Sequence, residues 1–239
     1  MPEIKYKRIL LKLSGESLSG EKTSGIYPEM VEKICREIMS VKELGVEIGI
    51  VIGGGNIFRG TDEKYSFMNR ASADYMGMLA TIINAIALQN YLEKMGVPTS
   101  VLSAINIDKI AEPCVRNNAL RYLENGRVVI FAAGTGNPFF TTDTAAAFRA
   151  IEIEANVVLK GTKVDGVYTK DPKIDSSAKK LDEVSYIQIV QEGLKVMDNT
   201  AVTLCMNHNV PIIVFNLFVK NNLKNIVLGN NIGTIVENK

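Results

Sequence analysis

Short apolar runs alternate with helical patterns along the whole chain. The runs are bounded by Gly, Ser, Pro or Asn, which is typical of buried strands. Between them, apolar residues recur three or four positions apart, as on one face of a helix. We predict strands over residues 8–13, 46–52, 99–103, 128–132, 156–160, 210–215 and 234–236, and helices over residues 28–44, 75–95, 113–124, 145–151, 186–192, 199–207 and 223–228.

This alternation predicts the fold class. Strands separated by helices pair in parallel through right-handed crossovers, so we expect an α/β fold, a three-layer αβα sandwich with a mostly parallel central sheet. The 239 residues can bury one sizeable core, and neither a repeat nor a linker interrupts the pattern. We therefore expect a single domain over residues 1–239, in which the charged segment 163–180 is a long loop or hairpin.

Composition and charge narrow the function. The net charge of +1 gives no global field that would favour nucleic acid or a membrane surface as a partner. Several polar residues interrupt the apolar segment 75–95, so we interpret it as a buried or interface helix and not a membrane span. The start of the sequence lacks a secretory signal, and the three cysteines have neither metal-ligand spacing nor a disulfide framework. We expect a cytoplasmic protein without a protein-held metal, and the single histidine, His208, excludes a histidine-based triad.

Unusual chemistry follows four of the predicted strands. Lys12 lies at the end of the first strand beside Ser-Gly, and three glycines with Arg59 close behind follow the second. The segment 134–143, GTGNPFFTTD, combines glycines, a Phe pair and hydroxyl groups before a helix. Lys160 ends a fourth strand. Ligands of open α/β sheets bind at the carboxyl ends of the strands, so we expect these groups to converge.

Each segment alone also has an ordinary explanation. Lys12 is then a surface lysine before a turn, the glycines form a strained turn, and the loop after Lys160 is simply solvated. Thr142 or Asp143 could cap the following helix, but a cap does not account for the eight residues before it. Together, two lysines, an arginine and bare glycine backbone at one edge predict a phosphoryl-transfer site. The chain has no G-x-x-x-x-G-K-[ST] motif, which excludes a P-loop kinase.

Six motifs, in this order along nearly the whole chain, resemble those of the bacterial uridylate kinases of the amino-acid kinase superfamily. They are KLSGE at 12–16, VIGGGN at 51–56, MGMLAT at 76–81, GTGNPFFTTD at 134–143, KVDGV at 163–167 and KVMD at 195–198. The resemblance implies an amino-acid kinase-like fold and ATP-dependent conversion of UMP to UDP in pyrimidine nucleotide biosynthesis. It also implies that the part up to about residue 155 serves UMP binding and oligomerisation, and that residues 156–239 bind ATP.

The resemblance further implies roles for matching residues. The catalytic group comprises Lys12, Arg59, Lys160 and Asp198, with Asp198 orienting the lysines. ATP binding falls to Lys12, Leu13, Ser14, Gly15, Gly55, Arg59, Thr162, Tyr168 and Asp171. UMP binding falls to Gly54, Asp74, Thr135, Gly136, Asn137, Pro138, Phe139, Phe140, Thr141 and Thr142.

The same resemblance implies Mg²⁺ bound with ATP, a homohexamer, and GTP and UTP as effectors. The stretch 21–27, EKTSGIY, departs from the Gly-Phe-Gly-Ile-Asp-like segment of many relatives, in a loop that the resemblance ties to this regulation. Three alternatives stay open at this point: a relative that phosphorylates a carboxylate or carbamate, a non-catalytic nucleotide sensor, and an NAD-dependent enzyme. The last lacks its glycine fingerprint after the first strand.

Overall fold

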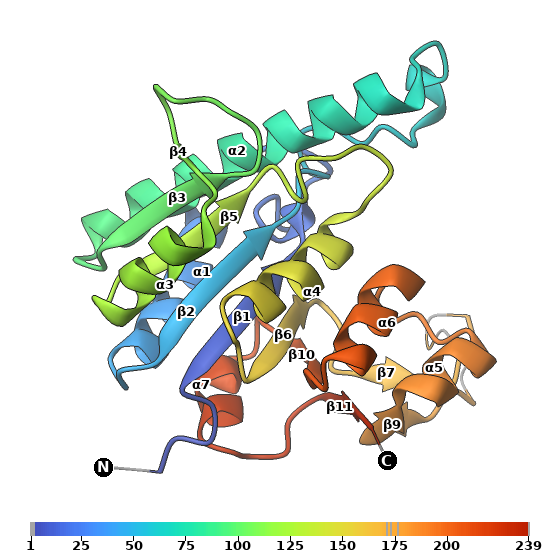
Figure 1. Ribbon diagram of the computed structural model, residues 1–239. Coiled ribbons are helices and arrows are strands. Elements are labelled where there is room, and N and C mark those ends of the chain that lie inside the picture. The colour runs from blue at the N-terminus through green and yellow to red at the C-terminus, as the bar shows by residue number, and fades with distance from the viewer. Residues whose placement is uncertain (1–2, 171, 173, 176, 239) are drawn as a thin grey trace.

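The computed structural model describes residues 3–170, 172, 174–175 and 177–238 (Figure 1). In this part of the chain a nine-stranded sheet has the order β4-β3-β5-β2-β1-β6-β10-β11-β9, and β7 and β8 form a separate pair. All neighbouring strands of the large sheet are parallel except β10 and β11. The expected α/β sandwich with a mostly parallel sheet is therefore confirmed.

The strands are short and mostly buried. Their side chains contact helices on both faces, which explains why they are nearly continuous apolar runs and not alternating ones. The strands are β1 (Arg8–Leu13), β2 (Glu47–Ile52), β3 (Thr99–Ser103), β4 (Glu112–Pro113), β5 (Val128–Ala132), β6 (Val157–Thr162), β7 (Val167–Tyr168), β8 (Lys180–Leu181), β9 (Glu183–Ser185), β10 (Ile212–Asn216) and β11 (Thr234–Glu237).

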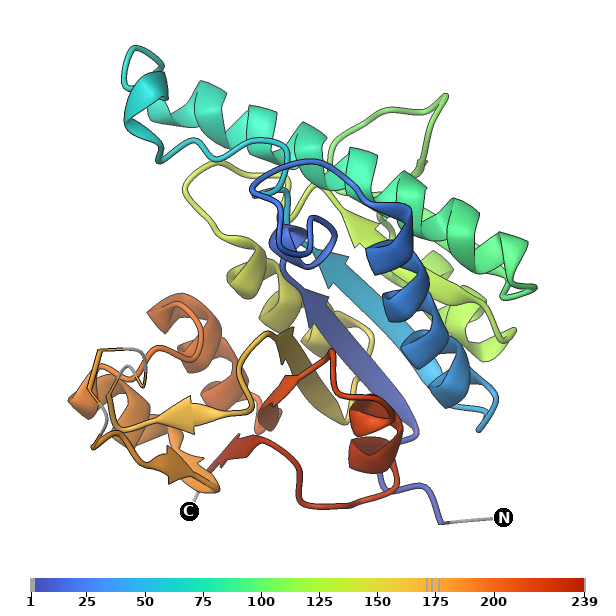
Figure 2. The same ribbon diagram turned by 180° about the vertical axis from the view of Figure 1, so that it is seen from behind.

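Two layers of helices cover the sheet. On one face lie α1 (Pro28–Lys42), α2 (Arg70–Lys94) and α7 (Asn222–Val227), which are nearest the viewer in Figure 2. On the other lie α3 (Arg116–Glu124), α4 (Thr142–Glu152), α5 (Tyr186–Glu192) and α6 (Asn199–Asn207) (Figure 1). Successive residues of β1 pack against different helix layers: Leu11 belongs to the core beneath α1, α2 and α7, and Leu10 to the core beneath α3 to α6.

The helix α2 is longer than the sequence pattern predicts. It begins at Arg70 and not near residue 75, because the Asn69 side chain caps it by accepting from the backbone N–H of Ser72. By length and composition it could cross a membrane, but 44% of its most apolar window is buried inside the protein. It packs on β2, β3 and β5 and against α1, as expected for a core helix with one outward face.

The segment 163–180 forms the expected hairpin, at least where the structure describes it. β7 pairs antiparallel with β8, with Val167 opposite Leu181 and Tyr168 opposite Lys180. Two short 3₁₀ turns that the pattern does not predict, Gly15–Ser17 and Glu63–Tyr65, follow β1 and β2. The first of these turns directly follows β1, at the edge where the parallel strands β5, β2, β1 and β6 end side by side. The candidate chemistry that follows these strands therefore lies at this edge.

Candidate active site

Two lysines and one aspartate form the centre of the site. Lys12 and Lys160 are register neighbours on β1 and β6, so their side chains leave the same face of the sheet. Lys12 Nζ lies 2.5 Å from Asp143 Oδ1, and Lys160 Nζ lies 2.8 Å from Asp143 Oδ2. Lys160 also donates to the carbonyl of Val196 at 2.7 Å. One carboxylate thus fixes both ammonium groups at the sheet edge.

Burial and charge determine how these groups ionise. Burial by itself raises the pKa of the Asp143 carboxyl, but the positive charges of Lys12 and Lys160 outweigh burial and hold that pKa below its ordinary value. Burial, and then the neighbouring charge of Lys12, lowers the pKa of Lys160, while Asp143 opposes this change. Lys12 itself is 8% exposed. The centre therefore holds two cations against one carboxylate, an excess of positive charge that suits a phosphate.

The role expected for Asp198, orienting the lysines, stays a prediction: its negative charge raises the pKa of Lys160, but its hydrogen bonds go to other partners. Its carboxylate accepts hydrogen bonds from the hydroxyls of Thr141 and Thr144, the latter at 3.0 Å, and from the backbone N–H of Ala201 at 2.9 Å. Asp198 is the N-cap of α6, and Asp143 holds the position beside the lysines. The physical reason is topological: α4 starts next to the ends of β1 and β6, so its first turn presents Asp143 to both lysines.

Close packing leaves no room for a side chain at Gly54 of the glycine turn after β2 (residues 53–55) or at Gly15, which faces the turn from the end of β1. A Cβ on Gly54 would lie 2.8 Å from both the Ala80 Cβ and the Gly77 carbonyl oxygen. A Cβ on Gly15 would lie 2.7 Å from the carbonyl oxygen of Gly53. The backbone N–H groups of this turn are consequently uncovered by side chains, as an anion-binding turn requires.

Arg59 extends the turn toward solvent. Its guanidinium forms an ion pair with Glu16, and both side chains are about half exposed. A Cβ on Gly55 would lie 3.5 Å from Arg59 Nη2, so the guanidinium lies beside the backbone of the turn. Arg59 is therefore placed to contact a bound phosphate if it leaves Glu16.

A cavity of about 280 Å³ opens between the glycine turn, the start of α2 and the 134–142 loop. Asp74 contributes to its wall and is fixed from two sides. Arg70 Nε donates to its two oxygens at 2.8 and 2.9 Å, and the N–H of Phe139 donates to Oδ2 at 2.7 Å. Of the residues expected to bind UMP or the phosphate junction, the cavity is lined by Gly54, Gly55, Arg59, Asp74, Thr135, Phe140, Thr141 and Thr142.

The 134–141 loop and the residue before it adopt unusual backbone conformations. Ala133, Gly134, Gly136 and Phe139 all adopt positive φ angles, and Ala133, at 62°, and Phe139, at 73°, do so without being glycine. Gly136, Asn137, Pro138 and Phe139 do not line the cavity in this structure. Instead, Thr135 and Asn137 hydrogen-bond with each other across the tip of the loop.

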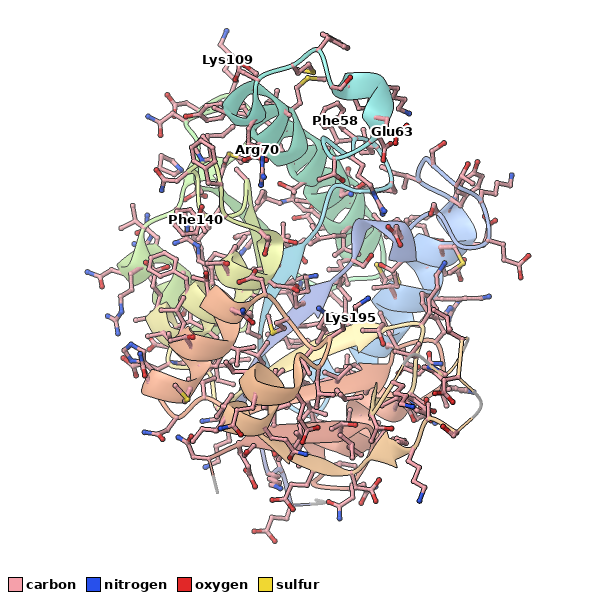
Figure 3. The ribbon with its side chains drawn as sticks, turned by 90° about the vertical axis from the view of Figure 1, so that its right-hand side faces the viewer. Phe58, Glu63, Arg70, Lys109, Phe140 and Lys195 are labelled. Carbon is pink, nitrogen blue, oxygen red and sulfur yellow. The ribbon has the colours of Figure 1, made fainter. Side chains whose placement is uncertain are left out.

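A second cavity, of about 350 Å³, lies at the β7 hairpin. Tyr168 is part of its wall and donates its hydroxyl to Asp165 at 2.8 Å. Lys195 lines the same cavity from the α5–α6 connection. In Figure 3 Arg70 and Phe140 lie on one side of the strand ends and Lys195 lies on the other. Each cavity reaches a neighbour of the lysine pair, because the first is lined by Thr142, next to Asp143, and the second by Lys195, next to the Val196 carbonyl that accepts from Lys160.

Two of the residues expected to bind ATP, Thr162 and Asp171, add nothing to the description of the second cavity. Thr162 uses its hydroxyl on the carbonyls of Val164, at 2.7 Å, and Phe215, at 3.2 Å, so it shapes the strand end. Asp171 lies outside the described residues. The sequence pattern gave Asp143 only a possible helix-capping role and gave Thr81, Asn84 and Lys195 no individual role. An acidic residue that opens a helix near two strand-end lysines was a usable signal for Asp143.

The site contains little that could hold a metal by itself. In the described ranges, no group of three or more His, Cys, Asp or Glu side chains is arranged to hold an ion. Asp143 is engaged by two lysines, and Asp198 by two threonines and a backbone N–H. This donor set fits Mg²⁺ that arrives with a nucleotide and is held mainly by phosphates and water.

Paired lysines, bare glycine backbone and two neighbouring cavities on an open parallel sheet define an α/β phosphotransferase without a P-loop. Residues 7–216 match the model of the amino acid kinase family, and the chain belongs to that family.

Three solved structures resemble this chain over nearly their full length. UMP kinase from Bacillus anthracis is 39% identical, with a TM-score of 0.95, and the match covers 98% of this chain and 97% of that one. UMP kinase from Ureaplasma parvum is 40% identical, with a TM-score of 0.91 and coverages of 98% and 100%. Uridylate kinase from Archaeoglobus fulgidus is 30% identical, with a TM-score of 0.74 and coverages of 95% and 99%.

Proposed function

We propose that this protein is a UMP kinase, which transfers the γ-phosphoryl group of ATP to UMP and releases ADP and UDP. The observation that carries the proposal is the lysine pair on Asp143, with one cavity at the glycine turn and another at the β7 hairpin. The likeness to two UMP kinases at 39% and 40% identity supports UMP as the phosphoryl acceptor. In a cell, this activity would serve pyrimidine nucleotide biosynthesis.

UMP would occupy the cavity beside Asp74. Its phosphate would meet the N–H groups of Gly54 and Gly55 together with Arg59, and its ribose hydroxyls would donate to the Asp74 carboxylate. Thr135 to Thr142 would surround the base. Asp74 already accepts the N–H of Phe139, so bound ribose would share or replace that hydrogen bond.

ATP would occupy the opposite cavity, with its triphosphate directed at the lysine pair. The backbone at Ser14 and Gly15 would bind phosphate oxygens, and Tyr168 would flank the base. This arrangement supports a division in which residues up to about 155 bind UMP and form subunit contacts, and residues 156–239 bind ATP.

Transfer needs charge stabilisation and alignment more than proton removal. Lys12 and Lys160 would stabilise the negative charge of the phosphoryl group in transit, and Asp143 keeps both ammonium groups aimed at it. The acceptor oxygen of UMP is already ionised near neutral pH, so no general base is required. Mg²⁺ bound to ATP would neutralise further phosphate charge when present.

A substrate panel tests the function directly. ADP release is measured with UMP, CMP, glutamate, aspartate or carbamate as acceptor, each with Mg²⁺ and ATP. Turnover with UMP that greatly exceeds turnover with the other four supports the proposal. Robust turnover with glutamate and none with UMP would overturn it in favour of a carboxylate kinase, and ATP binding without turnover of any acceptor would favour a nucleotide sensor.

We infer further that the protein is a cytoplasmic homohexamer with GTP and UTP as effectors. Apolar side chains on the outward face of α2 support subunit contacts, and free, unpaired cysteines fit a reducing compartment. Repeating the substrate assay with GTP and with UTP tests the regulation. Rates that respond to neither nucleotide would contradict the proposed regulation. The test is informative for this chain because segment 21–27 differs from the corresponding segment of many relatives.

A further inference from the structure

A buried pair of asparagines lies directly behind the glycine turn. Asn56 on the turn is 1% exposed, and Asn84 on α2 is fully buried. Asn56 Nδ2 donates to Asn84 Oδ1 at 3.1 Å, and Asn84 Nδ2 donates to Asn56 Oδ1 at 2.7 Å. The two side-chain amides therefore form a reciprocal pair, closed off from water.

Each amide has a second hydrogen, and both are used on backbone carbonyls. Asn84 donates to the carbonyl of Gly53 at 2.7 Å, and Asn56 donates to the carbonyl of Gly25 at 2.9 Å. All polar atoms of the pair are thereby satisfied, which is the condition under which a buried polar pair fixes one geometry. An apolar side chain at position 84 would leave the buried Gly53 carbonyl without its donor, and one at position 56 would remove the donor to the partly buried Gly25 carbonyl.

The bond to Gly53 acts on the part of the turn that contacts phosphate. The Gly53 N–H continues the sheet by donating to Leu13 at 2.9 Å, while its carbonyl is held by Asn84. The peptide plane after Gly53 is therefore fixed, and that plane carries the N–H of Gly54. Asn84 thus sets the direction of an N–H group in the proposed phosphate site.

The bond to Gly25 connects the turn to the loop that precedes α1. The N–H of Gly25 donates to the carbonyl of Asn56 at 2.8 Å, so two hydrogen bonds join these two residues. Gly25 has a φ of +95°, a backbone conformation that glycine adopts without strain. The loop around residue 25 consequently cannot move without affecting the turn.

We propose that Asn56 and Asn84 are positioning residues for phosphoryl transfer. They orient the backbone N–H groups of the glycine turn toward the acceptor phosphate, and they link this turn to the 20–27 loop. The inference rests on the proposed function for the identity of the acceptor, but the geometry applies to any phosphate bound at the turn.

The test replaces one donor group by one acceptor atom. Asn84→Asp keeps the size of the side chain but cannot donate to Gly53 or Asn56. We expect kcat/KM for UMP to fall about 10- to 100-fold, because small misplacements of binding groups have effects of this size. The Kd for ATP alone, measured by calorimetry, should change less than about twofold, since the ATP cavity lies beyond the lysine pair.

A control separates positioning from general weakening of α2. Leu88 is fully buried one turn further along the same helix and contacts the core instead of the turn. Leu88→Ala should lower the unfolding temperature while kcat/KM for UMP stays within about twofold at temperatures where it is folded. If Asn84→Asp does not fold, Asn84→Ser takes its place, since it adds no charge. Equal losses in the Asn84 and Leu88 variants, or wild-type kinetics in the Asn84 variant, would overturn the proposal.

A second readout does not depend on turnover. In protein labelled with ¹⁵N-glycine, the amide resonances of Gly54 and Gly55 should shift on addition of UMP or inorganic phosphate in the wild type, and weakly or not at all in Asn84→Asp. If the wild type shows these shifts with phosphate but does not phosphorylate UMP, the proposed function fails and the positioning role stands. Identical shifts in both proteins would refute the positioning role.

Discussion

Lys12, Lys160 and Asp143 act as one unit at the scale of single residues. Two buried ammonium groups would repel each other without the carboxylate, and the carboxylate alone would repel a phosphate. With all three, the sheet edge keeps an excess positive charge, and Asp143 fixes the positions of the two ammonium groups. Removing one member should therefore affect transfer more than the folding of the distant core.

Lys12→Ala is the first prediction at this scale. We expect kcat to fall about 10²- to 10³-fold, because a group that stabilises charge in the transition state is lost. UMP binding should change far less, because Lys12 does not line the cavity proposed for UMP. Steady-state kinetics and calorimetric titration with UMP measure the two effects. Small and equal changes in kcat and in the UMP Kd would count against the role of Lys12.

The pH profile is the second residue-scale prediction. The pKa of Lys160 is lowered by burial and by Lys12, so its ammonium loses its proton at lower pH than an ordinary lysine. Asp143 and, more weakly, Asp198 oppose this shift. As pH rises through the Lys160 pKa, the charge needed for transfer is lost and kcat should decline.

The matched variant for this prediction is Lys160→Arg, whose guanidinium stays charged throughout the range. We expect the alkaline decline of kcat, followed between about pH 7 and 10.5, to move to higher pH in this variant, whatever its maximal rate. An unchanged alkaline limb would show that another group controls it.

At the scale of elements, α2 organises the acceptor side of the site. Three of its side chains hold two segments: Asp74 accepts the N–H of Phe139 and Thr81 accepts the N–H of Ala133 at 2.8 Å, both in the loop after β5, and Asn84 holds the glycine turn. The helix is thus a rigid support for loops that strand ends alone would leave free. The sequence of α2 does not indicate this role, because the three polar residues are widely spaced in a mostly apolar helix.

Thr81→Val tests the helix as a support. Valine has nearly the same shape but leaves the buried Ala133 N–H without an acceptor, which costs about 1–3 kcal/mol of unfolding free energy. The 134–141 loop should loosen, so KM for UMP should rise several-fold while KM for ATP stays near the wild-type value. Urea unfolding and steady-state kinetics measure both effects.

Thr81→Ser is the matched control for this substitution, because it keeps the hydroxyl and loses only a methyl group. It should retain a near-normal KM for UMP. If serine and valine raise KM to the same extent, packing and not the hydrogen bond explains the effect.

At the scale of the whole molecule, the outward face of α2 remains exposed. Tyr75, Met76, Leu79 and Ile83 are between 39% and 50% exposed, although all four are large and apolar. Such a row on a helix that otherwise packs on the sheet is typical of a subunit contact. We expect the subunits of the proposed oligomer to contact one another through this surface.

Leu79→Glu combined with Ile83→Glu should break that contact, since burying two carboxylates in an apolar interface is costly. Light scattering after size exclusion should then report a smaller particle than for the wild type. Ile187→Glu on α5 is the control, because Ile187 is 59% exposed on an element outside the α2 face. An unchanged mass for the α2 variant, or an equal loss in the control, would exclude this face as the contact.

Much of the fold could be predicted because it depends on local patterns. The buried strands β1, β2 and β5 and the helices α1 and α6 lie close to where apolar periodicity predicts them. The sequence missed short elements such as β4 and β9, whose few residues are held by a neighbouring strand and not by their own preference. The start of α2 was missed because a polar first turn, capped by Asn69, lacks apolar periodicity.

The sequence by itself determined the class of fold, the strand ends that carry chemistry, and the motifs on which the family resemblance rests. Only the tertiary structure decided which groups meet: Asp143 forms ion pairs with both lysines, and Asn84 lies behind the glycine turn. The reason is physical. Apolar periodicity and turn residues are local properties of the chain, whereas ion pairs and buried hydrogen bonds join residues far apart in sequence, and their partners are fixed only when the sheet and helices pack.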